Sequence, residues 1–169
     1  AIIILTIAIM EGIEEDIFES LKSFSGCTIK INHKSIDNNF NVITNILNEN
    51  DIPFSLFNER KVVFENNDEY KIINVRGLEN IDIFKKRFDQ LEGLNPITQN
   101  GILRGKDLAY RLNVFPGDTI TMFSPLDAKI VTGNVPSENF VVKSIYSTRL
   151  LDFDANYAFV SYEAIKNMF

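Results

Sequence analysis

The sequence predicts an α+β fold in which short strands and helices alternate without an internal repeat. Residues 11–24 carry apolar side chains at helical spacing between acidic ones. Residues 62–64 and 70–75 are short β-rich runs separated by polar turn residues. Residues 140–146 alternate apolar and polar side chains, and a strand at 157–160 precedes a final helix.

Length and composition bound the class of protein. The chain has 169 residues, of which 45% are hydrophobic, and this is enough for a packed core in one domain or two small lobes. Asp and Glu number 23 against 17 Lys and Arg, and no basic run is present. Nucleic acid is therefore a poor candidate partner, because binding it requires a row of cations that can neutralise phosphates.

The first ten residues, AIIILTIAIM, contain one weakly polar residue, Thr6, and need an apolar environment. The helical pattern continues beyond Met10 with Ile13 and Ile17 among glutamates, which predicts the outer end of a transmembrane helix running on as an amphipathic helix. A signal peptide does not fit, since no positive charge precedes the stretch and no cleavage site follows it. The alternative is a buried strand over residues 2–9, because isoleucine favours strands.

The flank of this helix indicates its orientation. No Lys or Arg occurs before Lys22, whereas cytoplasmic flanks of membrane helices are rich in both. We therefore expect the folded remainder outside the cytoplasm.

The elements up to residue 92 follow from periodicity and turn residues. A half-buried strand is predicted at 27–31, and the apolar stripe of residues 40–47 predicts a helix that ends before Pro53. Ile81, Phe84, Phe88 and Leu91 predict a further helix. Between the two helices the predicted elements are a β-meander with strands at 54–57, 62–64 and 70–75 and turns at 58–60 and 66–68.

A lobe boundary is expected near residue 93, in a loop rich in Gly, Pro and Asn. After it come a strand that begins at Gly101, a helix with Leu108, Ala109 and Leu112 inward, and the turn Pro116-Gly117-Asp118. These elements are followed by a strand through residues 120–122, a long connection at 125–139, strands at 140–146 and 157–160, and a terminal helix.

No catalytic, cofactor or metal site is predicted. Cys27 suits a packed strand position, and the lone His33 cannot complete a zinc site, which needs three or four ligands. Residues 101–107, GILRGKD, have glycines one residue too close for a phosphate-binding loop. Asp152 and Asp154 are too few for a calcium site and are expected as solvated loop charges. Paired-carboxylate chemistry between distant Asp and Glu stays open.

Several stretches together resemble the LolC/LolE-type permeases of the lipoprotein-releasing ABC transporter. ILTIAIMEGIEEDIFESLKSFSG is similar to that family's first membrane helix and its extension, and INVRGLENID to its Val-x-Gly-Ile-Asp-Pro segment. GILRGKDLAYRLNVFPGDTITMFSP follows its Gly-x-x-Leu-Ala-x-x-Leu-x-Val-x-x-Gly-Asp stretch, and GNVPSENFVVKSIYSTRLLDFDANYAFVSYEAI resembles its closing strands and helix. The resemblance covers almost the whole chain and is least specific over residues 32–70.

The resemblance implies a MacB-like periplasmic core of the FtsX-like permease superfamily, in which an N-terminal helix leads into a porter-like α/β part with an inserted β-rich lobe. On this basis residues 1–24 are the end of the first transmembrane helix and its extension, residues 25–92 the first α/β part with the meander, and residues 93–169 the inserted lobe. The chain would be a fragment of an inner-membrane subunit, with this domain in the periplasm.

The same resemblance implies the partners and the mode of action. The subunit itself is not an enzyme, takes no cofactor and works with a cytoplasmic ATPase subunit, a second permease subunit, a periplasmic lipoprotein carrier, the lipoprotein cargo and membrane lipid. It releases lipoproteins from the inner membrane and passes them to the carrier. The two alternatives are MacB-like mechanotransmission with another cargo and a soluble α+β enzyme whose N-terminus is a buried strand.

Within the family, a proline-bounded hairpin of LolC-type subunits hooks the carrier, whereas LolE-type subunits lack a working hook. The connection PLDAKIVTGNVP, residues 125–136, corresponds to this hairpin. Its apolar residues would supply contact area unless they pack on the domain as in an ordinary hairpin loop. The candidate contact residues are Pro125, Leu126, Ile130, Val131, Gly133, Asn134, Val135 and Pro136.

Overall fold

The computed structural model describes residues 3, 6, 10–14, 29–31, 36–79, 88, 90–93, 100–128 and 135–168. The chain divides into two compact units, Ala1–Phe54 and Ser55–Phe169. The predicted limits after residues 24 and 92 stay predictions.

In the first unit, the described residues near the N-terminus are helical. Ile3, Thr6 and residues 10–14 lie in helical conformation, and the side chains of Ile3, Met10 and Ile13 are exposed. The alternative of a buried strand over residues 2–9 therefore does not fit Ile3 or Thr6. Among the residues that the structure describes, no helix is long and apolar enough to cross a membrane.

Helix α2 (Ile36–Glu49) confirms the helix predicted before Pro53. Its end is fixed locally, because the N–H of Ile52 donates to the carbonyl of Leu47 (2.9 Å) while Asp51 adopts a left-handed φ of 53°. Residues 29–31, part of the strand predicted at 27–31, are not in a strand, and residues 27 and 28 lie outside the described residues.

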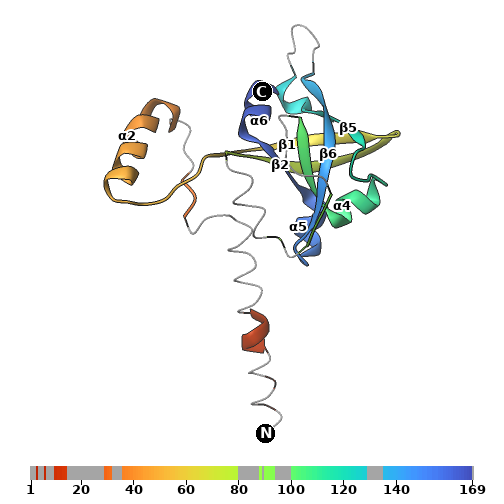
Figure 1. The fold of residues 1–169 in the computed structure, drawn as a ribbon, viewed down its shortest axis with the longest axis horizontal. Coiled ribbons are helices and arrows are strands. Elements are labelled where there is room, and N and C mark those ends of the chain that lie inside the picture. Colours follow the sequence, from red (N-terminus) through yellow and green to blue (C-terminus); the bar gives the residue numbers. More distant parts are fainter. Residues whose placement is uncertain are drawn as a thin grey trace. The chain divides into compact units, whose positions relative to one another are not determined.

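The second unit is a closed barrel of six strands (Figure 1). The order around the barrel is β6, β4, β7, β2, β1, β5 and back to β6, with β2–β7 and β4–β6 parallel and the other pairs antiparallel. A short seventh strand, β3 (Gln90–Gly93), pairs with the last residues of β6, whereas β5 pairs with the first ones. The barrel strands are β1 (Phe57–Asn66), β2 (Glu69–Leu78), β4 (Gly101–Gly105), β5 (Thr119–Phe123), β6 (Ser137–Ser147) and β7 (Tyr157–Ser161).

This barrel corrects the predicted fold class. An α+β fold with a porter-like α/β part and an inserted β-rich lobe was wrong, because strands form a closed barrel and dominate the described residues, among which helices are few and mostly short. The expected meander does not stand alone either: β2 pairs with β7, and β1 pairs with β5. These pairings join segments far apart in the sequence, and periodicity within a segment carries no information about them.

The β1–β2 hairpin differs from the predicted meander in its first strand and in one turn. Of the strand predicted at 54–57, only Phe57 is in a strand. Residues 58–60, predicted as a turn, continue β1, because each of them pairs with a residue of β2. The other predicted turn is confirmed: Asn67 and Asp68 connect the strands with φ of 50° and 64°. Two positive φ values in a two-residue connection are typical of a type I′ turn, whose twist matches that of a hairpin.

The described residues of the unit also contain three short helices and one 3-10 turn: α4 (Lys106–Arg111), η1 (Pro125–Asp127), α5 (Leu151–Asn156) and α6 (Tyr162–Met168). Leu108, Ala109 and Leu112 are buried, which confirms the inward face predicted for α4. Helices α4 and α5 contact each other, and α6 lies against β1, β2 and β7 (Figure 1). Leu91, predicted to lie on a helix, is instead in β3.

Alternation along the strands produces two apolar layers. Ile102 of β4 belongs to the interior of the barrel, whereas its neighbour Leu103 packs on the opposite face. In β6 the register against β4 shifts between Ile102 and Leu103, which leaves Lys143 as an extra residue. The interior is formed by Val62, Phe64, Ile73, Val75, Ile102, Leu108, Leu112, Val114, Ile120, Met122, Phe140, Val142, Ala158, Val160, Ala164 and Ile165.

Candidate functional site

The connection between β5 and β6 presents apolar side chains to solvent where it leaves the barrel. It begins with η1, whose first residue is Pro125, and Leu126 in this turn is 81% exposed. Val135, just before β6, is 38% exposed. Leucine and valine at this exposure offer contact area that the described part of the domain does not use.

The base of this connection is held by hydrogen bonds. The N–H of buried Ser124 donates to the carbonyl of Pro136 (3.1 Å), next to the register pair Phe123 and Ser137. The hydroxyl of Ser124 donates to Oδ2 of Asp127 (2.6 Å), which fixes the turn that carries Leu126. The connection is therefore anchored to two neighbouring barrel strands at a single point.

Four of the eight predicted contact residues can be placed. Pro125, Leu126, Val135 and Pro136 lie together at the anchored base of the connection. The other four, Ile130, Val131, Gly133 and Asn134, lie outside the described residues. Sequence reasoning missed the Ser124–Asp127 hydrogen bond, although Ser-x-x-Asp is a recognised signal for a side chain that closes a helical turn.

A second unusual feature is an arginine inside the barrel. Arg104 follows the interior residue Ile102 by two positions, is fully buried, and lies over the ring of Phe64 with its guanidinium carbon 5.2 Å from the ring centre. No described residue accepts a hydrogen bond from its side-chain nitrogens. Burial lowers the pKa of Arg104 to about 10, so the side chain is still charged at neutral pH.

Asp154 is not the solvated loop charge that the sequence predicted. It is buried in α5, and its carboxylate accepts hydrogen bonds from the N–H of Thr148 (3.1 Å), the hydroxyl of Thr148 (2.7 Å) and the hydroxyl of Ser147 (3.2 Å). Burial raises the pKa of Asp154, and these hydrogen bonds oppose the rise. Asp152 is exposed, so the two carboxylates do not share a site.

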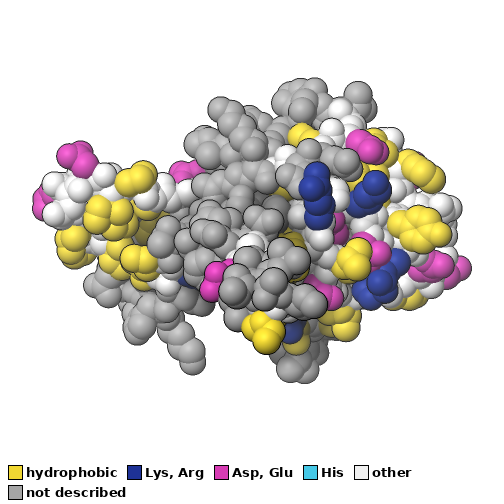
Figure 2. Space-filling model, turned by 90° about the horizontal axis from the view of Figure 1, so that it is seen from below, with side chains coloured by type: hydrophobic (Ala, Val, Ile, Leu, Met, Phe, Trp, Pro, Cys, Tyr) yellow, Lys and Arg dark blue, Asp and Glu magenta, His cyan; other side chains and the backbone are white. Residues whose placement is uncertain are grey.

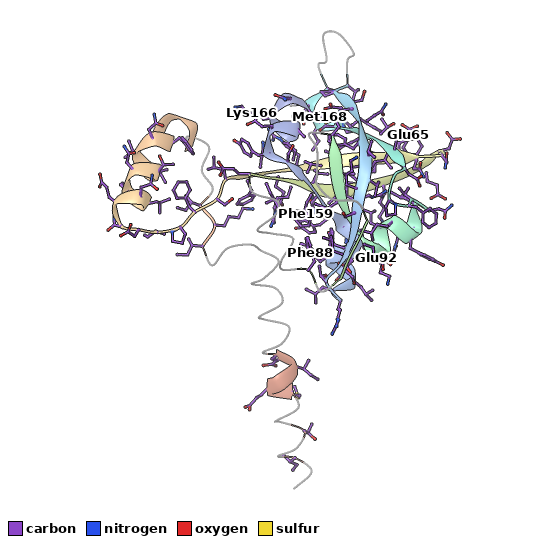
Figure 3. The ribbon with its side chains drawn as sticks, viewed as in Figure 1. Glu65, Phe88, Glu92, Phe159, Lys166 and Met168 are labelled. Carbon is purple, nitrogen blue, oxygen red and sulfur yellow. The ribbon has the colours of Figure 1, made fainter. Side chains whose placement is uncertain are left out.

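An aromatic layer covers the opposite face of β4, β6 and β7. The ring of Phe88 stacks on Tyr146 at 4.5 Å and lies close to Phe159 (Figure 3). The hydroxyl of Tyr146 donates to the carbonyl of Tyr157 (2.8 Å), which leaves this buried group satisfied. Burial raises the pKa of Tyr146 well above its usual value, so it stays neutral and structural.

Arg76 contacts aromatic rings and forms an ion pair with Glu59. Its Nη2 and Nε donate to Oε2 of Glu59 at 2.7 and 3.0 Å, and its guanidinium lies over the rings of Phe57 and Tyr157. The contacts account for a charged side chain that is 8% exposed.

No protein-family model matches the sequence, and no curated protein matches it at a significant level.

The buried polar side chains described above belong to structural networks of the fold. Arg104, Asp154 and Tyr146 are each enclosed in the fold, and Cys27 and His33 lie outside the described residues. On the face shown in Figure 2, the Lys and Arg side chains lie among acidic and hydrophobic ones and form no basic run. The exposed base of the β5–β6 connection is therefore the candidate site for a partner.

Proposed function

We propose that this chain is the periplasmic domain of an inner-membrane permease subunit of the lipoprotein-releasing type. In this role it couples ATP hydrolysis by a cytoplasmic partner subunit to the transfer of lipoproteins from the membrane to a periplasmic carrier. The observation that carries the proposal is the β5–β6 connection, which is anchored at Ser124 and Pro136 and exposes Leu126 and Val135. The sequence resemblance supports the same assignment.

The energy of lipid extraction explains why such a domain must transmit work. Each buried CH₂ holds an acyl chain in a membrane by about 0.8 kcal/mol, so removing a multiply acylated lipoprotein costs on the order of 30 kcal/mol. A binding domain alone cannot supply this free energy, whereas ATP hydrolysis in a partner subunit can contribute to it through rigid-body movement. The barrel offers a stiff body for such movement, because its six strands close on themselves.

The anchored connection suits the contact with a carrier. Since Ser124 and Pro136 join adjacent strands, the exposed side chains of Leu126 and Val135 move together with the barrel. A carrier bound there would be held at a constant position relative to the domain while the lipid is handed over. Apolar side chains flanked by polar ones are typical of transient protein contacts.

The test is capture of a purified periplasmic lipoprotein carrier by the full chain. We expect the Leu126→Ser/Val135→Ser variant to bind the carrier at least tenfold more weakly, with an unchanged melting temperature. The matched control is Tyr110→Ser, since Tyr110 is 86% exposed on α4 and lies outside the connection. Equal capture by the wild type and the Leu126→Ser/Val135→Ser variant would overturn the assignment.

A further inference from the structure

Strand β2 has one open edge along half of its length. Its whole length pairs with β1, but β7 pairs only with the half that starts at Asn74. Residues 69–73 therefore have a strand on one side only within the described structure. The side chains of Tyr70 and Ile72 in this half are 59% and 67% exposed. Figure 3 shows the adjacent Glu65 near the turn end of the hairpin.

The turn determines which peptide groups face the open edge. Asn66 and Glu69 pair across a two-residue type I′ turn, and such a flanking pair is joined by hydrogen bonds. In an antiparallel ladder every second residue bonds to the same neighbour, so Lys71 also bonds to β1. The peptide groups of Tyr70 and Ile72 consequently face the open edge, where another strand can bind them.

We propose that this edge binds the same edge of a second copy of the chain, antiparallel and related by a two-fold axis, with Tyr70 opposite Tyr70. The charges select this register. It places Glu69 opposite Lys71 of the second copy, and symmetry repeats the pair. Opposite charges at directly facing positions stabilise a sheet, and like charges destabilise it.

The neighbouring registers are unfavourable. A shift one way places Lys71 opposite Lys71, and a shift the other way places Glu69 opposite Glu69. A register centred on Ile72 requires Asn74 to pair with the second copy, but its outer edge is already occupied by Tyr157 of β7. Only the register centred on Tyr70 therefore combines a free edge with complementary charges.

Side chains on the outer face of the hairpin would contribute to the same contact between the two copies. Val63 of β1 lies between Ile72 and Phe123 in the strand register, which makes an apolar row across three strands. The ring of Tyr70 meets Phe123 edge-on, with 6.4 Å between the ring centres, and its hydroxyl donates to Glu65. Pairing the two edges would place both Tyr70 rings side by side and extend the row into the second copy. The interface rests on the barrel and is independent of the carrier-binding role.

Charge exchange tests the register on the full chain in a mild detergent, which keeps the apolar first ten residues from causing association. Sedimentation over a concentration series should show a wild-type dimer. We expect Lys71→Glu or Glu69→Lys to weaken dimerisation at least tenfold, and Glu69→Lys/Lys71→Glu to restore it. Lys61→Glu, on the neighbouring strand, is the control for net charge. A wild type that stays monomeric, or a double variant that does not recover, would overturn the proposal.

Cross-linking provides a second readout. A facing pair joined by hydrogen bonds has its Cα atoms about 5.5 Å apart, within the range that a disulfide spans. In a Cys27→Ser background, Tyr70→Cys should therefore form a disulfide-linked dimer under mild oxidation, and Lys61→Cys should not. Equal cross-linking at the two positions would contradict the register.

Discussion

Gly105 lies directly against the backbone of Asp154. A Cβ atom at Gly105 would overlap the carbonyl oxygen of Asp154, which is backbone and cannot move aside as a flexible side chain can. This contact brings the start of α4 onto α5, so the close approach of the two helices depends on the absence of a side chain at this position.

We therefore expect Gly105→Ala to lower the free energy of unfolding by about 1–3 kcal/mol, the usual cost of overpacking. Urea denaturation followed by circular dichroism measures the change. Gly12→Ala is the control, because a Cβ at Gly12 would meet nothing within 4 Å. Equal stability of Gly105→Ala and the wild type would show that the two helices can separate at no cost.

Asp154 should make the stability of the fold depend on pH. Burial raises its pKa from the ordinary value of 3.8, so between 3.8 and the raised pKa the folded protein binds more protons than the unfolded chain. The free energy of unfolding should therefore fall as the pH rises through this window. Asp154→Asn removes the titration, and the difference between wild type and variant should change with pH in that sense. A difference that is constant from pH 3 to pH 7 would contradict this assignment.

Arg104 should be a cost to stability. Replacing even a paired buried charge by apolar side chains often stabilises a protein by about 1–4 kcal/mol, and Arg104 has no hydrogen-bonding partner among the described residues to offset its desolvation. We expect Arg104→Met to raise the free energy of unfolding by this amount, as measured by urea denaturation. Arg104→Lys, which keeps the charge, should give no gain.

The same residue gives a test at high pH. Burial lowers the pKa of Arg104 to about 10, so above pH 10 the unfolded chain holds this proton more tightly than the folded protein. The wild type should therefore gain stability relative to Arg104→Met as the pH rises above 10. Reversal of this trend would show that the guanidinium finds a partner.

The turn of the β1–β2 hairpin should accept glycine. Asp68 has a φ of 64°, a conformation that glycine adopts at no steric cost. We expect Asp68→Gly to raise the melting temperature slightly, equivalent to at most about 1 kcal/mol. Asp118→Gly, in which the loop loses the carboxylate that accepts a hydrogen bond from the N–H of Phe115 (2.8 Å), should instead lower it.

Local elements could be predicted from the sequence where periodicity and turn residues agree. Helix α4 has its apolar residues at helical spacing, and Gly117 in the predicted turn has a φ of 101°, which favours glycine. The prediction failed at residues 58–60, where three consecutive polar residues suggested a turn but continue the strand, with Glu59 bound to the buried Arg76 and Arg60 exposed. A strand accepts polar residues where they are solvent-exposed or paired with a distant side chain, so polarity alone does not distinguish a strand from a turn.

Closure of the barrel could not be predicted in the same way. The parallel pairs β2–β7 and β4–β6 depend on contacts between distant segments, and the extra residue Lys143 changes which side chains of β6 face inward. The burial of Asp154 was missed for a related reason: the residues that satisfy its carboxylate lie at the end of β6, and the chain turns back to bring them together. Of the candidate site, the sequence indicated the apolar connection but not its anchoring by Ser124.

Strand β6 pairs with three other strands, and these pairings determine how the domain would bear a mechanical load. One edge of β6 pairs with β4, and the other pairs first with β5 and then with β3. Tension on the connection before Ser137 acts along the strand, so the hydrogen bonds to these neighbours are strained simultaneously in shear and do not open one after another. Bonds loaded together resist a much larger pull than bonds loaded in sequence, and the point where the connection joins the barrel is thereby a mechanically strong attachment.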